Sequence, residues 1–165
     1  MHKVNLCKNA NVQKLVKEYL MGIFICRSGG SVLYSYQVDP NLNVDLISQF
    51  VAALNLFGTE KVGKIKRIII EGINVEMSIV SEYNLIITIF FRPAMVKDYL
   101  KIESEKALKM FYKQYKPLLE QNRTNQMLYS KFDESMCVLI HDYLIRVGVL
   151  DEWDVCEHRD EYFDI

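Results

Sequence analysis

The run Leu85–Phe91 constrains the fold more than any other stretch, because the strand that it predicts is apolar on both faces. Its sequence is LIITIFF, in which Thr88 is the only polar residue. Successive side chains of a β-strand point to opposite sides of the sheet, so this strand needs an apolar cover above and below it. The run Met21–Cys26 is similarly two-faced, whereas Ile73–Val80 alternates apolar and polar residues. This contrast predicts a sheet whose central strands lie between two layers of helices.

Two glycines between strand-like runs predict a tight turn in the first third of the chain. Met21–Cys26 and Ser31–Tyr36 flank the segment RSGG, which ends in Gly29 and Gly30. Glycine readily adopts the positive φ angles that a short reversal requires, so the two runs should form a β-hairpin. A glycine pair can also belong to a phosphate-binding loop. This segment lacks the glycine-rich phosphate-loop patterns and precedes a strand instead of a helix, which favours the plain turn.

The stretch Leu42–Gly72 predicts one amphipathic helix followed by a strand. Apolar residues recur at helical spacing over its first half, at Leu46, Ile47, Phe50, Val51, Leu54 and Phe57. Asn43 or Asp45 can cap this helix, and Gly58 stands where a left-handed C-terminal residue is expected. The side chains expected to cover the sheet are Ile47, Phe50, Leu54 and Phe57, with Leu46, Val51 and Ala52 toward the margins. The helix has more apolar positions than one face needs, which fits either a broad core stripe or a partner surface.

The remaining elements follow from the same patterns. A short helix is expected over Val12–Leu20, before the hairpin. Three strands are expected after the central helix, at Lys64–Ile70, Ile73–Val80 and Leu85–Phe91. A long helix should begin near Ala94 and be kinked or ended by Pro117. Asp133 should cap a last helix that Gly148 closes. We therefore expect one domain over residues 1–150, in which residues 1–20 form an N-terminal extension with a short helix.

Charge is distributed unevenly between this domain and the tail at residues 151–165. The formal net charge is -1, yet the tail holds seven acidic residues against one arginine, which leaves a net of +5 on residues 1–150. A nearly neutral chain argues against bulk nucleic-acid binding. Three aromatic residues punctuate the acids, at Trp153, Tyr162 and Phe163. The tail is therefore interpreted either as a disordered solubilising end or as a segment that docks on the lysine-rich body.

Candidate chemical sites are incomplete. Cys137 and His141 stand four residues apart on the last predicted helix, and Cys156 lies near His158, but neither pair has the further ligands of a zinc site. No nucleophile, base and orienting group can be assembled, so we expect a protein that is not an enzyme and holds neither metal nor cofactor. The cysteines show no CxxC pair and the longest apolar run has seven residues, which predicts a reduced, cytoplasmic chain without a transmembrane segment.

The order of elements resembles the longin and roadblock families of profilin-like domains. The resemblance covers residues 21–147 and is strongest in Leu46–Leu54, in Phe57 and in the strand at 64–72. It implies an α+β fold with a five-stranded antiparallel sheet of order 2-1-5-4-3. One helix is then expected on one face and two or more on the other. Chains of this organisation are familiar from archaea that encode eukaryote-like trafficking genes, so the resemblance also suggests an archaeal source.

The resemblance implies a non-enzymatic module that regulates Ras-like small GTPases or takes part in vesicle-trafficking assemblies. Its expected partners are a second longin- or roadblock-like chain, in a homodimer or heterodimer, and a Ras-like GTPase, with membrane recruitment only through partners. The interface expected from it comprises Leu46, Phe50, Val51, Leu54, Lys64, Lys66, Arg67 and Ile68. The basic residues among these can instead discourage edge pairing.

Two other functions fit the same sequence. The chain can be a structural subunit of an adaptor or coat-like complex. It can also be a ligand-sensing module of the PAS or profilin-like kind, which needs an enclosed pocket near Phe24, Tyr34 and Phe90. A pocket of that kind is the structural feature that separates the sensing module from the interaction module.

Overall fold

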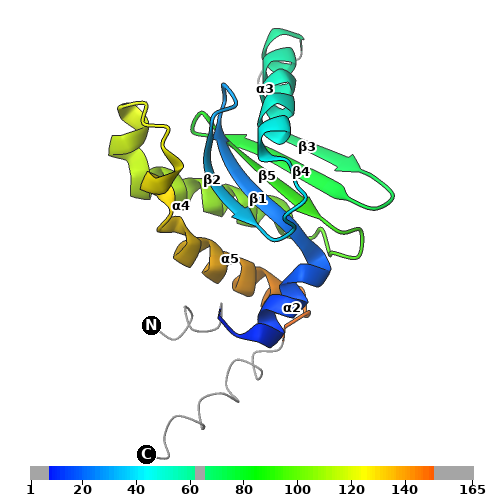
Figure 1. Ribbon diagram of the computed structural model, residues 1–165. Coiled ribbons are helices and arrows are strands. Elements are labelled where there is room, and N and C mark those ends of the chain that lie inside the picture. The colour runs from blue at the N-terminus through cyan, green and yellow to red at the C-terminus, as the bar shows by residue number, and fades with distance from the viewer. Residues whose placement is uncertain (1–7, 62–65, 151–165) are drawn as a thin grey trace, which may run out of the picture.

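The computed structural model describes residues 8–61 and 66–150. The elements are α2 (Ala10–Tyr19), β1 (Leu20–Arg27), β2 (Val32–Gln37), α3 (Val44–Lys61), β3 (Arg67–Glu71), β4 (Glu76–Glu82), β5 (Leu85–Phe91), α4 (Leu100–Glu120), the short 3-10 helix η1 (Gln126–Tyr129) and α5 (Phe132–Arg146). Figure 1 shows them arranged around a single sheet. The predicted hairpin, meander and helices are all present.

The sheet has the predicted strand order β2-β1-β5-β4-β3, and each neighbouring pair is antiparallel. The central pair is β1 and β5, in which Ile23 lies opposite Ile89 and Ile25 opposite Ile87. All of β5 and nearly all of β1 are buried. The prediction of two-sided central strands is therefore confirmed.

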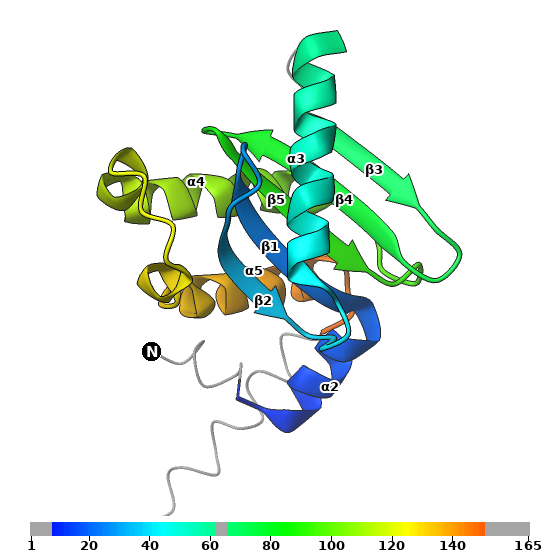
Figure 2. The same cartoon turned by 45° about the horizontal axis from the view of Figure 1, so that its top comes forward.

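Helices cover both faces of this central pair. Figure 2 shows α3 alone in front of the sheet, with α4 and α5 behind it and α2 leading directly into β1. Ile23 and Ile87 join the large core with α4 and α5, whereas Phe24 and Phe90 pack beneath α3 with their ring centroids 5.9 Å apart. The alternation along β1 and β5 thus divides the interior into two separate cores.

The core behind the sheet is built around aromatic rings. Phe111 of α4 stacks on Tyr129 at 5.4 Å between ring centroids and meets Phe132 edge to face at 5.0 Å.

Asp133 connects α5 to the sheet. The hydroxyl of Tyr34 on β2 donates a hydrogen bond of 2.8 Å to a carboxylate oxygen of Asp133. Asp133 lies in the first turn of α5, so this hydrogen bond connects the helix to β2. It is not the N-cap that its position in the sequence suggested.

The core beneath α3 is thin, and the sequence assigned its residues partly to the wrong face. Val51 is buried with Ile79 and Ile86, and Ile47 and Leu54 pack against this cluster. By contrast, Phe50 keeps 41% of its surface exposed and Phe57 keeps 58%. Helical spacing identifies stripes but not the stripe that turns inward, because this helix is apolar on more than one side.

Four predicted boundaries are wrong. The helix expected from Ala94 begins at Leu100, after turns that end with Tyr99 at φ 65°. Pro117 does not end the helix, since α4 continues to Glu120. Gly58 likewise does not end α3, which continues to Lys61. The run from Ile73 to Val75 forms the β3–β4 loop, in which Ile73 is 96% exposed.

Gly30 sets how closely the β1–β2 turn approaches α3. Its φ is 96°, and a Cβ placed on it would lie 2.7 Å from the Cβ of Ala52. Beside it, the Asn55 side-chain amide donates a hydrogen bond of 3.3 Å to the Ser28 carbonyl. The turn and the middle of α3 are therefore in direct contact.

We expect Gly30→Ala to lower the free energy of unfolding by about 1–3 kcal/mol, because it strains the backbone and pushes α3 away from the turn. Urea denaturation measures this change. Gly29→Ala is the matched control, since an added Cβ there meets nothing within 4 Å and the φ of Gly29 is not positive. Equal losses in the two variants would contradict the proposed close approach.

Candidate functional site

Strand β3 leaves one edge of the sheet unpaired in the described part of the chain. It hydrogen-bonds to β4, from Arg67 opposite Val80 to Glu71 opposite Glu76, and is last in the strand order. Four of its five residues are exposed, and only Ile68 is partly buried. An edge strand presents free backbone N–H and C=O groups, which is a template for pairing with another chain.

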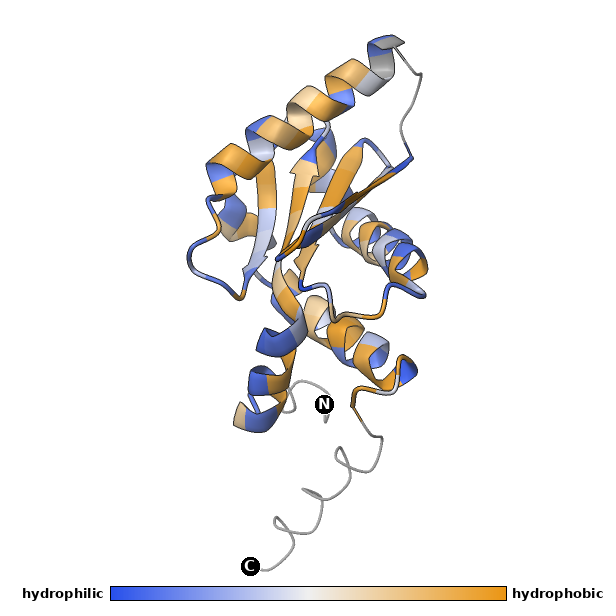
Figure 3. Ribbon diagram, turned by 90° about the vertical axis from the view of Figure 1, so that its right-hand side faces the viewer, coloured by the Kyte–Doolittle hydropathy of each residue, from blue (hydrophilic) through white to orange (hydrophobic). Residues whose placement is uncertain are grey.

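A stripe of apolar side chains on α3 lies beside this edge. Leu46, Phe50 and Phe57 are spaced at steps of four and seven residues, which places them on one side of the helix, and Leu46 is 65% exposed. Figure 3 shows that hydrophobic residues surround much of α3, which overhangs the sheet. Contiguous exposed apolar surface of this kind marks an interaction site.

The stripe and the edge form one surface. The inner side of α3 is joined to β3 because Leu54 and Ile68 pack on the same buried cluster. Ile70 lies two residues after Ile68, on the same side of the strand, and is exposed. We call Leu46, Phe50, Phe57, Ile70 and the open backbone edge of β3 the α3–β3 surface.

A lysine from the far side of the sheet holds the end of β3. The Lys97 ammonium lies 2.6 Å from Glu71 Oε1 and 2.7 Å from Glu76 Oε2. Its hydrogen bond to Glu71 lowers the pKa of that carboxylate, and the hydrogen bonds to Glu71 and Glu76 raise the pKa of Lys97. The β3–β4 hairpin is therefore clamped to the segment before α4, so the edge is presented in a defined position.

The interface residues expected from the sequence fall into three groups. Leu46, Phe50, Lys66 and Arg67 are exposed, and Leu54 and Ile68 are partly buried. Val51 is only 1% exposed, so it supports α3 from below and is not available to a partner. Lys64 and the tail residues Trp153, Tyr162 and Phe163 lie outside the described residues. Sequence reasoning missed Phe57 as a surface residue, because it assigned this side chain to the stripe that covers the sheet. It placed Ile70 in the edge strand but did not name it among the interface residues.

The pocket that a ligand-sensing module would need near Phe24, Tyr34 and Phe90 does not form in the described structure. Phe24 and Phe90 belong to the core beneath α3, whereas Tyr34 packs on Phe132 in the core behind the sheet. The sheet itself separates them. The described structure therefore lacks the enclosed pocket that the ligand-sensing alternative requires at this place.

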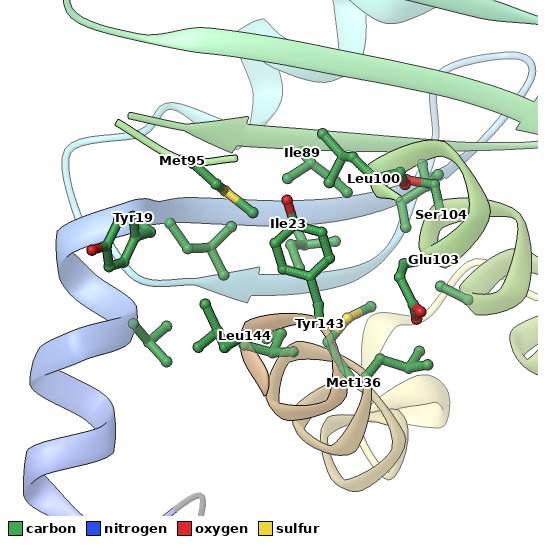
Figure 4. Close-up of a pocket in the computed structure, with 16 residues that line it drawn as sticks. Tyr19, Ile23, Ile89, Met95, Leu100, Glu103, Ser104, Met136, Tyr143 and Leu144 are labelled. Atoms are coloured by element: carbon green, nitrogen blue, oxygen red, sulfur yellow. The ribbon is translucent and has the colours of Figure 1, made fainter. Parts of the chain in front are cut away.

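A different cavity of about 50 Å³ lies between the sheet, α4 and α5 (Figure 4). Its lining is apolar except for a few groups, chiefly Glu103, Ser104 and Tyr143. Glu103 Oε1 lies 2.6 Å from Arg146 Nη1, and the Ser104 hydroxyl donates to the Leu100 carbonyl. For comparison, an apolar cavity that binds benzene has a volume of roughly 150 Å³. This one is therefore large enough for ordered water and too small for a preformed cofactor site.

No group of three or more potential metal ligands occurs among the described residues. Cys137 is disulfide-bonded, so its sulfur is not a free thiolate ligand beside His141, and it is not the reduced thiol that we expected. Cys26 is fully buried, and burial raises the pKa of its thiol to about 12. Within residues 8–61 and 66–150, no helix is long and apolar enough to span a bilayer.

Comparison with known proteins supports the fold. No protein-family model and no curated protein matches the sequence. Among solved structures, MglB from Myxococcus xanthus superposes with a TM-score of 0.51 at 15% identity, over 67% of this chain and 89% of that one. A roadblock/LC7 domain from Streptomyces avermitilis gives 0.49 at 14% identity, over 65% and 92%. The gliding protein MglB from Thermus thermophilus gives 0.47 at 10% identity, over 64% and 82%.

The fold is therefore of the roadblock-like, longin-type class. The sheet order and the division of helices between its faces agree with the expectation from the sequence resemblance. At 15% identity the likeness establishes this architecture and no particular partner.

Tyr143 offers a test of the cavity. Its hydroxyl is buried without a hydrogen-bond partner among the described residues, and burial raises its pKa to about 12, with the carboxylates of Asp98 and Glu103 adding to the shift. The unfolded chain loses this proton near the ordinary value of 10.0. Stability from the protonated hydroxyl is thus complete below pH 10 and is lost as the pH rises toward 12.

We expect Tyr143→Phe to change the free energy of unfolding by less than about 0.5 kcal/mol at neutral pH, because no hydrogen bond is lost. Between pH 10 and 12 the free energy of unfolding of the variant should rise relative to that of the wild type by about 1.4 kcal/mol per pH unit, because only the wild type loses stability as its tyrosine deprotonates. Urea denaturation at several pH values measures both. Tyr129→Phe is the contrast, since it removes a 2.5 Å hydrogen bond to the Arg123 carbonyl and should cost about 1 kcal/mol at neutral pH. A loss of that size in Tyr143→Phe would show that the hydroxyl has a partner.

Proposed function

We propose that this chain is a non-enzymatic interaction module that pairs with a second roadblock-like chain through its α3–β3 surface and serves as a platform for a Ras-like small GTPase. The observation that carries the proposal is the continuity of an open strand edge with an exposed apolar helix stripe. Edge pairing supplies backbone hydrogen bonds, and the stripe supplies apolar burial. Together they match the requirements of a stable interface.

The charges on β3 favour pairing with a second copy. In an antiparallel pair centred on Ile69, Arg67 of one strand lies opposite Glu71 of the other, and this contact occurs twice because of the two-fold symmetry. Opposite charges across a strand pair stabilise it. Basic residues on an edge can discourage pairing, but this edge carries a basic residue at one end and an acidic residue at the other.

The GTPase part of the proposal rests on the resemblance to roadblock and longin domains and on the shared fold. The described residues contain no group of three or more potential metal ligands, and the apolar cavity between the sheet, α4 and α5 is too small for a cofactor. The feature that carries the proposal is therefore the exposed surface for other proteins. Such a platform acts by surface complementarity and not by chemistry. A role in vesicle trafficking, in the cytoplasm, is part of the same proposal.

Charge reversal on β3 tests the pairing. We expect Arg67→Glu alone and Glu71→Arg alone to weaken the homodimer by about tenfold or more, because each places like charges opposite one another at two contacts. An equimolar mixture of the two variants should recover the dimer, since one strand then carries two acidic and the other two basic residues at these positions. Light scattering across a dilution series measures the three samples. Dimers of equal strength in all samples would place the interface elsewhere.

The apolar half of the surface is tested separately. Phe50→Asp should weaken the dimer at least tenfold without unfolding the chain, because this side chain is already 41% exposed in the protomer. Met127→Asp is the matched control, since Met127 is 78% exposed on η1, away from α3 and β3. Sedimentation equilibrium measures both variants. A dimer that tolerates Phe50→Asp as well as Met127→Asp would exclude α3 from the interface.

The GTPase platform is tested by pull-down with Ras-like GTPases from the same genome, loaded with GTP or GDP. We expect at least one to be retained, and retained differently in the two nucleotide states. The Phe50→Asp variant shows whether this retention requires the dimer. A protein that dimerises but ignores every GTPase in both states would contradict the platform while leaving the pairing intact.

A further inference from the structure

The outer side of α4 carries a row of lysines that have no acidic partner among the described residues. Lys106, Lys109 and Lys113 are exposed and spaced by three and four residues, so they lie on one side of the helix. The flanking lysines do have partners, since Lys101 pairs with Glu105 and Lys116 with Glu120. We call Lys106, Lys109 and Lys113 the lysine ridge. It lies on the α4 side of the sheet, away from the α3–β3 surface.

The described chain ends close to the start of this ridge. The N–H groups of Val149 and Leu150 donate to the Leu144 carbonyl at 2.9 and 3.1 Å, and Leu150 is buried, so the chain after α5 is held against the body. Just before it, Arg146 reaches the first turn of α4. Its guanidinium lies 2.6 Å from Glu103 and 5.5 Å from the centre of the Tyr99 ring. Glu103 is three residues before Lys106.

The segment that follows has the composition to cover the ridge. Residues 151–165 carry seven carboxylates and one arginine, together with Trp153, Tyr162 and Phe163. From Glu103 to Lys113 the helix extends about 15 Å, and fifteen residues of extended chain reach up to about 50 Å. The tail is therefore long enough to run along the whole ridge from its starting point at Leu150.

An apolar contact is available at the beginning of that path. Ile102 is 56% exposed and lies four residues before Lys106, on the same side of α4. Trp153 is three residues beyond Leu150, a reach of about 10 Å. Isolated surface ion pairs contribute little, so an aromatic anchor beside several charges is what such a contact requires.

We propose that the acidic tail at residues 151–165 docks in cis along the lysine ridge of α4, with Trp153 against Ile102, and shields this face from other acidic partners. Tethering supports the cis arrangement, because a segment attached at Leu150 is present at a high effective concentration near α4. Helix α2 offers a less complementary site, since its Lys14 and Lys17 stand beside the acidic Glu18. Because the ridge is separate from the α3–β3 surface, tail docking and dimerisation can succeed or fail independently.

The protein contains a built-in probe, since Trp153 is its only tryptophan. At low salt we expect acrylamide to quench its fluorescence several-fold less than in urea. Roughly 1 M NaCl shortens the Debye length to about 3 Å and should remove this protection. In the triple variant Lys106→Glu, Lys109→Glu, Lys113→Glu, acrylamide should quench Trp153 fully already at low salt. The circular dichroism spectrum of this variant should equal that of the wild type, which shows that the fold is retained.

Two controls separate this result from the other surfaces. The pair Lys66→Glu and Arg67→Glu reverses charge at the start of β3 and in the residue before it, and should leave Trp153 protected. In the tail, Asp160→Asn, Glu161→Gln and Asp164→Asn should weaken the protection without changing the ridge. The tail variant should also bind vesicles that contain phosphatidylserine several-fold more tightly than the wild type, because the lysines are uncovered.

Four results would overturn the proposal. The first is that acrylamide quenches Trp153 as strongly at low salt as in urea. The second is that Trp153 stays protected when the charges of the lysine ridge are reversed. Protection that disappears on dilution, together with the dimer, would place the tail on a second copy. Equal vesicle binding by the wild type and the tail variant would show that the tail does not cover the lysines.

Discussion

The buried pair of central strands is the constraint on which the rest of the structure depends. Because β1 and β5 are apolar on both faces, neither face can be left to water, and each requires its own helical layer. The layer formed by α4 and α5 closes over an aromatic cluster and the larger core. The other layer is a single helix. The interaction surface arises because the two layers differ in size. A single helix cannot bury all of its apolar residues when these lie around much of its circumference.

Two local contacts make the thin layer specific. Gly30 allows the β1–β2 turn to meet Ala52, so α3 is held near its middle and not only by its few buried side chains. At the far edge, Lys97 holds the β3–β4 hairpin through Glu71 and Glu76. The helix stripe and the strand edge are thereby kept in a fixed relation. A preordered surface loses less conformational freedom on binding, which favours association.

The sequence predicted the elements well and their contacts less well. The two-sided central strands and the presence of helices on both faces were correct, because alternation and helical spacing are properties of short segments. The strand order and the division of helices between the faces were correct too, but they came from the resemblance to longin and roadblock domains. Errors occurred where a choice depended on distant residues. The run from Ile73 to Val75 has a strand pattern, but it has no partner on β5, because the pairing of β4 with β5 starts at Glu76. The pocket that the ligand-sensing alternative requires would have joined Tyr34 and Phe24, but the sheet separates them.

By itself, the sequence determined that a five-stranded sheet would be covered on both faces and that α3 would carry surplus apolar residues. Only the tertiary structure decided that Val51 faces inward while Phe50 and Phe57 face out. The physical reason is that a helix with several apolar stripes has no unique inner side until its supports are placed. Here the Gly30 turn and the partners Ile79 and Ile86 select the Val51 side. The same choice leaves Phe50 and Phe57 beside the open edge of β3, where no single segment of the sequence could have placed them.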